Sequence, residues 1–221
     1  MPAHRPAALL VDLDGTLVDS EPLHFEAHRR HLAAHGIAIT MDDLHGNIGK
    51  GDLNFYAELM RKRGITGDAA AWVAEKTDVL LGIYQNEGLA LGRGGQALVD
   101  WVVSKALPRM VVTNSERRLC VAALRAAKVD RIFHSRVVHE DSSNHKPHPA
   151  PYLLAAERFG VPAADCLAIE DSEPGVRAAV AAGCRTVGVY GLVPAATLQA
   201  AGAHFLVDQI GEVVRILEGV A

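Results

Sequence analysis

The sequence predicts an α/β protein, built as a parallel sheet with helices on both faces and interrupted by a helical insertion. Short runs that are apolar throughout alternate with stretches of helical periodicity, as is typical of strands covered on both faces. Three of these runs end directly in polar, reactive residues, which is where open parallel sheets bind their ligands. One segment after the first strand breaks the alternation and indicates the insertion.

The expected strands are five short apolar runs at 7–11, 109–113, 166–169, 186–190 and 204–207. Helices are expected between them at 95–103, 116–127, 150–159 and 175–182. The first three runs end in polar residues or are followed directly by them. Because the carboxyl ends of parallel strands meet at one edge of a sheet, we expect these pairs to converge: Asp12 and Asp14, Thr113 and Asn114, and Glu170 and Asp171.

The insertion contains helix-like segments at 21–35, 53–63 and 68–85, and no strand-like run separates them. We therefore expect residues 1–18 and 88–221 to form a Rossmann-like α/β core domain. Residues 19–87 are expected to form a helical cap domain above the strand ends.

The composition is that of an ordinary globular protein. Of the 221 residues, 49% are hydrophobic and 22% are charged, which excludes a disordered chain. A net charge of −4 gives no basic excess for binding a nucleic acid, and the uncharged stretch 186–207 is interrupted by glycines and a proline, unlike a membrane span. We expect a cytoplasmic monomer that binds neither nucleic acid nor membrane, with three reduced cysteines: Cys120, Cys166 and Cys184.

The acidic residues at the predicted strand ends point to a metal site. The segment Asp12-Leu13-Asp14-Gly15-Thr16 holds two carboxylates that repel each other unless a cation intervenes, although a plain turn is an alternative interpretation. Glu170 and Asp171 bring the number of carboxylates at this edge to four. Oxygen ligands of this kind suit Mg²⁺, which is commonly shared with a substrate phosphate.

Two further patches could bind an anion at the same edge. Lys146, beside Pro147, is a second candidate cation, with a solvated loop lysine as the alternative. Thr113 and Asn114 offer a hydroxyl, an amide and backbone N–H groups before a predicted helix, where an anion is favoured. A helix cap is the alternative for this pair.

Together these patches resemble the haloacid dehalogenase superfamily. The resemblance rests on DLDGTLVDSEPLH at 12–24, VVTNS at 111–115, KPHP at 146–149 and IEDSEPGVRAAVAAG at 169–183, which come in the family's order and cover most of the chain. More closely, the chain resembles the branch with a helical cap after the first strand. That branch holds β-phosphoglucomutases, phosphoglycolate phosphatases and many sugar-phosphate phosphatases.

The resemblance implies a role for each residue at the predicted sheet edge. Asp12 would be the nucleophile that forms an aspartyl-phosphate, and Asp14 would be the general acid and then the general base. Asp171 would bind Mg²⁺ together with the Asp12 carboxylate and the Asp14 backbone carbonyl, and Glu170 would be a metal or metal-water partner. Three residues would hold the phosphoryl oxygens: Thr113, Asn114 and Lys146.

The resemblance leaves the reaction open. In the mutases a histidine linked to a cap lysine positions the general acid, and His24 with Lys76 matches this arrangement, but many phosphatases share the motif around His24. The mutases also carry a cap-loop arginine that grips the distal phosphate. Lys50 stands in that loop here and lacks the bidentate fork of an arginine.

We therefore predict a Mg²⁺-dependent phosphatase that hydrolyses a small phosphorylated metabolite, of the sugar phosphate or phosphoglycolate type, with His24 and Lys50 as further substrate-binding residues. A β-phosphoglucomutase-like phosphomutase is the first alternative. A non-catalytic phospho-receiver or interaction domain is the second. It would need neither Asp14 as acid and base nor the helical insertion, so the insertion and Lys146 argue against it.

Four histidines form a stripe on the first helix of the insertion. His24, His28, His31 and His35 are spaced by four, three and four residues, so they share one helix face. Pairs at i and i+4 can bind zinc or nickel. The alternative is a polar helix face with His24 alone directed at the active site, and it is favoured because no orienting acid is evident on that face.

Overall fold

The structure is a computed structural model that describes residues 5–40, 43 and 51–219. The chain divides into two compact units, one formed by residues 1–19 and 89–221 and the other by residues 20–88. Across the described ranges, no helix combines the length and the apolar character that crossing a membrane requires.

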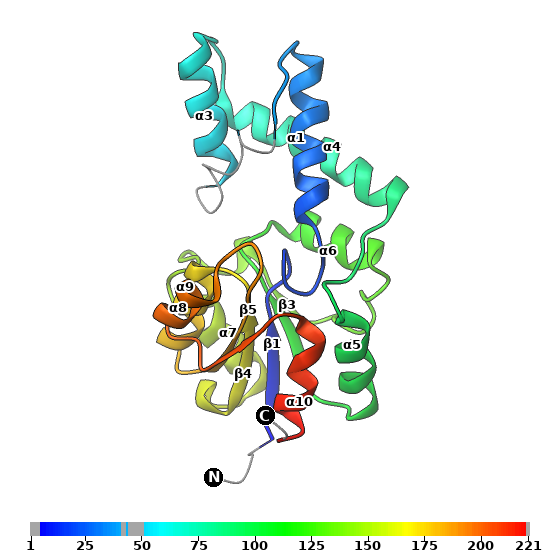
Figure 1. The fold of residues 1–221 in the computed structure, drawn as a ribbon, viewed down its shortest axis with the longest axis vertical. Helices are drawn as coiled ribbons and strands as arrows, with labels where there is room; N and C mark the ends of the chain where they lie inside the picture. The colour runs from blue at the N-terminus through cyan, green and yellow to red at the C-terminus, as the bar shows by residue number, and fades with distance from the viewer. Residues whose placement is uncertain (1–4, 41–42, 44–50, 220–221) are drawn as a thin grey trace. The chain divides into compact units, whose positions relative to one another are not determined.

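The larger unit is built on a six-stranded sheet with the order β3-β2-β1-β4-β5-β6, and every neighbouring pair is parallel (Figure 1). The strands are β1 (Ala8–Val11), β2 (Arg109–Val112), β3 (Arg136–Val137), β4 (Cys166–Glu170), β5 (Arg185–Val189) and β6 (Phe205–Val207). The predicted α/β class with a parallel sheet is confirmed.

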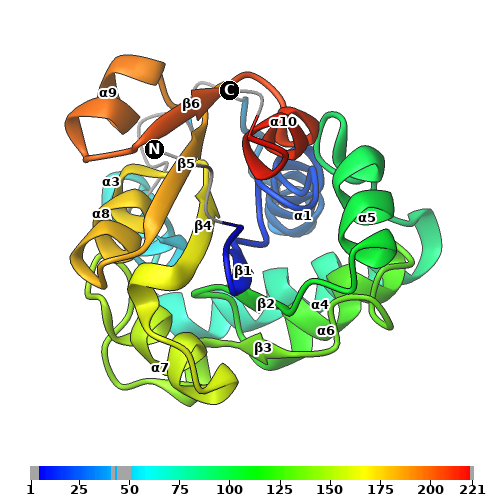
Figure 2. The same ribbon diagram turned by 90° about the horizontal axis from the view of Figure 1, so that it is seen from below.

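Helices cover both faces of this sheet (Figure 2). One face carries α7 (Ala150–Phe159), α8 (Glu173–Ala181) and α9 (Ala195–Ala200), and the other carries α5 (Gly95–Ser104), α6 (Arg117–Ala126) and α10 (Val213–Leu217). The division follows from right-handed crossovers, because the chain adds strands in one direction from β1 to β3 and in the other from β4 to β6. Short 3₁₀ turns lie at His139–Asp141, Ala163–Asp165 and Ile210–Glu212.

The central strands are buried on both faces, which explains why their sequences are apolar throughout. All residues of β1 are completely buried, and Ala8 and Leu10 pack into a cluster with Tyr152 of α7. β1 pairs with β2 on one side and β4 on the other, with Val11 opposite both Val111 and Ile169. The strand order reverses at β1, so the carboxyl ends of β1, β2 and β4 meet where ligands bind in such sheets.

Some elements differ from the prediction. β3 was not predicted, because two residues are too few to show a periodic pattern, and α10 was also missed. Glu170, expected just beyond a strand, is the last residue of β4 and completely buried. α8 begins at Glu173, two residues early, because the Ser172 hydroxyl accepts a hydrogen bond of 3.1 Å from the Gly175 N–H and caps the helix.

The described part of the smaller unit contains α1 (Glu21–Ala34), α3 (Asp52–Arg63) and α4 (Ala69–Glu87), and α4 packs against both of the others. Its core includes Leu32, Phe55 and Tyr56. α4 is capped at its start by Asp68, whose carboxylate accepts a hydrogen bond of 2.8 Å from a backbone N–H of the first turn. The role of this unit as a cap stays a prediction.

Candidate active site

The predicted polar residues of the larger unit follow the carboxyl ends of three adjacent strands. Asp12 comes directly after β1, Thr113 after β2 and Asp171 after β4. Asp12, Glu170 and Asp171 each offer a carboxylate oxygen, and these oxygens all lie within 4.8 Å of one another. Asp12 is only 8% exposed. The sheet thus brings together carboxylates that are almost 160 residues apart in the chain.

Lys146 inserts its ammonium group among these carboxylates. Its Nζ lies 2.6 Å from Asp12 Oδ1 and 2.6 Å from Glu170 Oε1, and it donates to the carbonyl oxygen of Val112 at 2.7 Å. The side chain is 5% exposed, so the alternative of a solvated loop lysine is wrong. Asn114 holds the lysine's backbone: its Oδ1 accepts from the Lys146 N–H at 3.1 Å, and its Nδ2 donates to the Lys146 carbonyl at 3.3 Å.

Glu170 is held from three sides. Its Oε1 accepts a hydrogen bond from the Tyr152 hydroxyl as well as from Lys146, and its Oε2 accepts one of 3.3 Å from the Ser172 hydroxyl. The first turn of α8 can approach this carboxylate only through a glycine, since a Cβ on Gly175 would lie 1.9 Å from Glu170 Oε2. Tyr152 could not be singled out from the sequence, because a tyrosine on an apolar helix face is ordinary core.

Two hydroxyl groups that belong to the sequence motifs, but to which the sequence assigned no role, hold the remaining aspartates. Ser115 Oγ donates to Asp14 Oδ2 at 2.6 Å, and Thr16 Oγ1 donates to Asp171 Oδ1 at 3.1 Å. Gly15 has φ +74°, and a Cβ there would lie 2.2 Å from Asp171 Oδ2. The segment after β1 is therefore a turn as well as part of the acidic group. A glycine is needed at position 15 because it adopts the positive φ and because it leaves room for the Asp171 carboxylate.

The electrostatics of this group favour an additional cation. Burial raises the pKa of Asp12 well above its ordinary value, and the charges of Glu170 and Asp171 add to the rise while Lys146 opposes it. Burial by itself lowers the pKa of Lys146, but Asp12 and Glu170 outweigh it and the lysine stays charged. Lys146 is one positive charge against three carboxylates. A donor set made only of carboxylate oxygens fits a hard divalent ion such as Mg²⁺.

Thr113 and Asn114 support the local structure. The Thr113 hydroxyl accepts a hydrogen bond of 3.0 Å from the Ser115 N–H, and the Asn114 amide is bonded to the Lys146 backbone. The N-cap residue of α6 is Glu116, so the alternative that Thr113 or Asn114 caps this helix is wrong. Their binding of phosphoryl oxygens stays a prediction.

His24 belongs to the helical unit, where the structure links it to Lys76. Lys76 Nζ lies 3.0 Å from His24 Nδ1 and donates to Asp52 Oδ2 at 2.8 Å, and the lysine is only 1% exposed. Lys50, the other residue of this unit predicted to bind substrate, lies outside the described residues.

Comparison with known protein families places this site in context. A model of the haloacid dehalogenase-like hydrolases matches residues 6–183. The chain belongs to this hydrolase family. The resemblance carried by the four motifs is therefore confirmed, and so is the prediction of an enzyme. A catalytic hydrolase is favoured over the non-catalytic phospho-receiver.

Individual proteins similar to this chain include a phosphatase and a solved structure of the same fold. A phosphorylated carbohydrates phosphatase of Thermotoga maritima is 31% identical over 187 residues, which cover 84% of this chain and 85% of the relative. The protein SUPPRESSOR OF QUENCHING 1 of Arabidopsis thaliana is 32% identical over 95% of this chain, which spans 20% of that protein's length. The solved structure of a candidate β-phosphoglucomutase from Thermotoga maritima matches with a TM-score of 0.83 at 30% identity, covering 97% of this chain and 99% of the other.

Proposed function

We propose that this hydrolase is a magnesium-dependent phosphatase that acts on a small phosphorylated carbohydrate through an aspartyl-phosphate. The position of Lys146 carries the proposal: its Nζ lies 2.6 Å from both Asp12 and Glu170, and an oxygen of each of these carboxylates lies within 4.8 Å of one of Asp171. A carboxylate nucleophile, a buried cation and further carboxylates for a metal are what phosphoryl transfer needs. The phosphatase from Thermotoga maritima supports the substrate class, because its name specifies phosphorylated carbohydrates.

In the proposed reaction, an Asp12 carboxylate oxygen attacks the phosphorus atom of the monoester. The new bond from this oxygen to phosphorus forms as the ester P–O bond breaks. Asp14 gives its proton to the leaving oxygen and then takes a proton from the water that attacks the phosphorus and frees Asp12. The 2.6 Å hydrogen bond from Ser115 to Asp14 Oδ2 supports this role, because it restricts the rotation of the carboxyl group.

In this proposal the surrounding groups stabilise the negative charge of the phosphoryl group and of Asp12. The carboxylates of Asp12 and Asp171 and the backbone carbonyl of Asp14 would hold Mg²⁺, which would supply positive charge where the nucleophile and the phosphate, both anions, meet. Lys146 stabilises the phosphoryl oxygens together with Thr113 and Asn114. Glu170, already bonded to Lys146, orients the lysine and can accept a hydrogen bond from metal-bound water.

The proposal is tested by measuring hydrolysis of p-nitrophenyl phosphate, sugar phosphates and phosphoglycolate, with Mg²⁺ and with excess EDTA. We expect EDTA to abolish activity and Mg²⁺ to restore it. Asp12→Asn should lower kcat by about 10³-fold or more, because the nucleophile is lost. Asp165→Asn is the matched control: this residue precedes β4 at the opposite end of the strand and should leave activity unchanged. Substantial turnover by Asp12→Asn would refute the proposed nucleophile.

A phosphomutase is the second candidate, and the 3.0 Å contact between Lys76 and His24 favours it. The test is to supply β-glucose 1-phosphate with a bisphosphate primer and to follow both products. Formation of the 6-phosphate faster than the release of inorganic phosphate would identify a mutase, whereas release of phosphate alone supports the phosphatase.

A further inference from the structure

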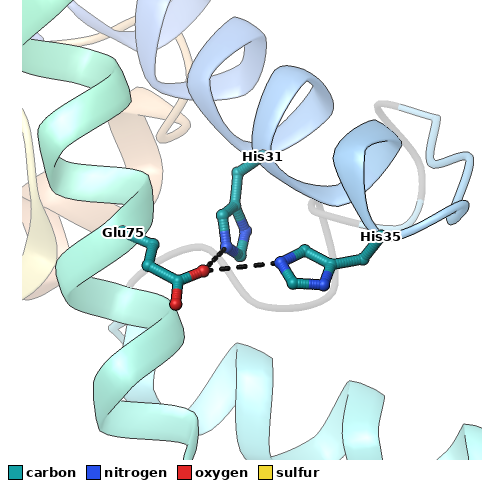
Figure 3. A group of neighbouring side chains, drawn as sticks. All are labelled: His31, His35 and Glu75. Atoms are coloured by element: carbon teal, nitrogen blue, oxygen red, sulfur yellow. Dashed lines mark hydrogen bonds and ion pairs between the residues drawn. The ribbon is translucent and has the colours of Figure 1, made fainter.

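The histidine-rich face of α1 is not a solvated polar face, because His28 and His31 are each only 4% exposed. His31 of α1 and His35, the C-cap residue that directly follows this helix, both face Glu75 of α4 (Figure 3). His31 Nε2 lies 3.0 Å from Glu75 Oε2, and His35 Nε2 lies 3.4 Å from the same oxygen. The orienting acid that the helix itself lacks is thus supplied by a different helix.

A chain of hydrogen bonds behind His31 determines which of its ring nitrogens carries the proton. The Asp52 carboxylate accepts, so the His28 Nε2 that lies 3.3 Å from its Oδ1 must donate. When the two histidine rings are neutral, His28 Nδ1 accepts from the Tyr56 hydroxyl at 3.0 Å. The Tyr56 oxygen in turn accepts from His31 Nδ1 at 3.1 Å. The His31 Nε2 that faces Glu75 is left with a lone pair.

In this tautomer the lone pair of His31 Nε2 faces the lone pairs of Glu75 Oε2. A neutral imidazole nitrogen and a carboxylate oxygen 3.0 Å apart repel unless a cation joins them, and that cation is either an additional proton or a metal ion. His35 brings a third donor atom, and the three donor atoms all lie within 4.8 Å of one another.

We propose that His31, His35 and Glu75 form a zinc-binding site in which the ion joins a histidine of α1, the histidine at its C-terminal cap and a carboxylate of α4, with water as the fourth ligand. Tetrahedral zinc bonds of about 2.0–2.1 Å place neighbouring donor atoms roughly 3.3 Å apart. The observed separations of 3.0 Å and 3.4 Å match that spacing. The ligands therefore need little movement to accept the ion.

The surroundings support the proposed ligands. Tyr56 orients the His31 ring through Nδ1, as the hydrogen-bond partners of metal-bound histidines generally do. The His35 ring stacks on Trp72 with centroids 4.5 Å apart and an interplanar angle of 28°. The His35 and Glu75 side chains are 37% and 54% exposed, so an ion can reach them from solvent. Because the ligands come from two helices, the bound ion cross-links α1 to α4 and stabilises the folded unit.

The test titrates the full-length protein with Co²⁺ in the presence of excess Mg²⁺, which competes for the acidic site of the larger unit. Tetrahedral Co²⁺ absorbs in the visible range, and Zn²⁺ should displace it and remove the bands. We expect one equivalent to bind, and we expect His35→Ala and Glu75→Gln to weaken the affinity at least tenfold. Zn²⁺ should raise the Tm of the parent but not of these variants.

Further variants keep the test decisive. His139→Ala is the matched control, because His139 and His145 form a stacked pair with centroids 3.9 Å apart, where a metal ion could also bind. It should bind Co²⁺ like the parent. Tyr56→Phe removes the hydroxyl that orients His31 and should weaken binding about tenfold. The Tm measured without metal checks that each variant folds. Absence of tetrahedral bands in the parent would overturn the proposal and favour a proton between His31 and Glu75, and unchanged binding by His35→Ala would overturn it as well.

Discussion

The replacement of Gly175 by alanine tests how the acidic group is held. Gly175 lies in the first turn of α8, where helix propensity alone predicts that alanine is more stable than glycine by about 0.5–1 kcal/mol. In the structure the added Cβ would lie 1.9 Å from Glu170 Oε2. That carboxylate is completely buried and bonded to Lys146, Tyr152 and Ser172, so it cannot move aside without breaking one of these contacts.

Gly175→Ala should therefore destabilise the protein. Forcing a methyl group into a packed site costs about 1–3 kcal/mol. When the propensity gain of about 0.5–1 kcal/mol is subtracted, the middle of the two ranges leaves a net loss of about 1 kcal/mol in the free energy of unfolding. Displacement of Glu170 also removes one of the groups that position the Lys146 ammonium, so kcat for phosphate release should fall as well.

Gly82→Ala is the matched control. Gly82 lies inside α4, and an added Cβ would meet nothing within 4 Å, so alanine should stabilise the protein by about 0.5–1 kcal/mol and leave kcat unchanged. Urea unfolding followed by circular dichroism gives the free energies, and hydrolysis of p-nitrophenyl phosphate gives kcat. If Gly175→Ala were as stable and as active as Gly82→Ala, the close contact with Glu170 would not constrain this position and the reasoning would be refuted.

Three other predictions concern buried polar groups. Asp52→Asn should destabilise the helical unit by about 1–3 kcal/mol, because it removes the charged partner of buried Lys76. Glu58→Gln, which breaks an exposed ion pair, should cost under about 0.5 kcal/mol, and thermal unfolding compares the two variants. Burial raises the pKa of Asp52, but His28 and Lys76 outweigh it and hold the pKa below the ordinary 3.8. The stabilisation by the ionised Asp52 is therefore present above about pH 4 and declines at lower pH. The pH profile of Asp52→Asn should lack this decline. Tyr152→Phe removes a donor to buried Glu170 and should cost about 1–2 kcal/mol in urea unfolding; parent-like stability would show that this hydrogen bond contributes nothing. Burial raises the pKa of each cysteine thiol, to about 12 for Cys120 and Cys184 and to about 11 for Cys166. A disulfide reagent at pH 8 should therefore label these cysteines only after the protein unfolds. Rapid labelling of the folded protein would contradict their burial.

The sheet and the acidic residues could be predicted from the chain because both follow from local patterns. A strand buried on both faces must be apolar along its whole length, and the first polar residue after it must lie near the sheet edge. Asp12 and Thr113 follow this rule, and each lies just beyond the end of its strand. In β4 the first polar residue, Glu170, is still the last residue of the buried strand, and Asp171 lies just beyond it. The rule failed for β3, because two residues cannot carry a period.

The partners of these residues depended on the folded chain. Local patterns tell which face of a helix or strand is buried, but they contain no information on which distant segment packs against that face. The burial of Lys146 between Asp12 and Glu170 requires the segment that carries the lysine to reach the carboxyl ends of β1 and β4, and the opposition of Glu75 to His31 requires two helices to pack in one register. Periodicity in the amino-acid order therefore predicted the elements and the chemistry available at their ends. The contacts that set charge, tautomer and orientation were established by packing over long sequence separations.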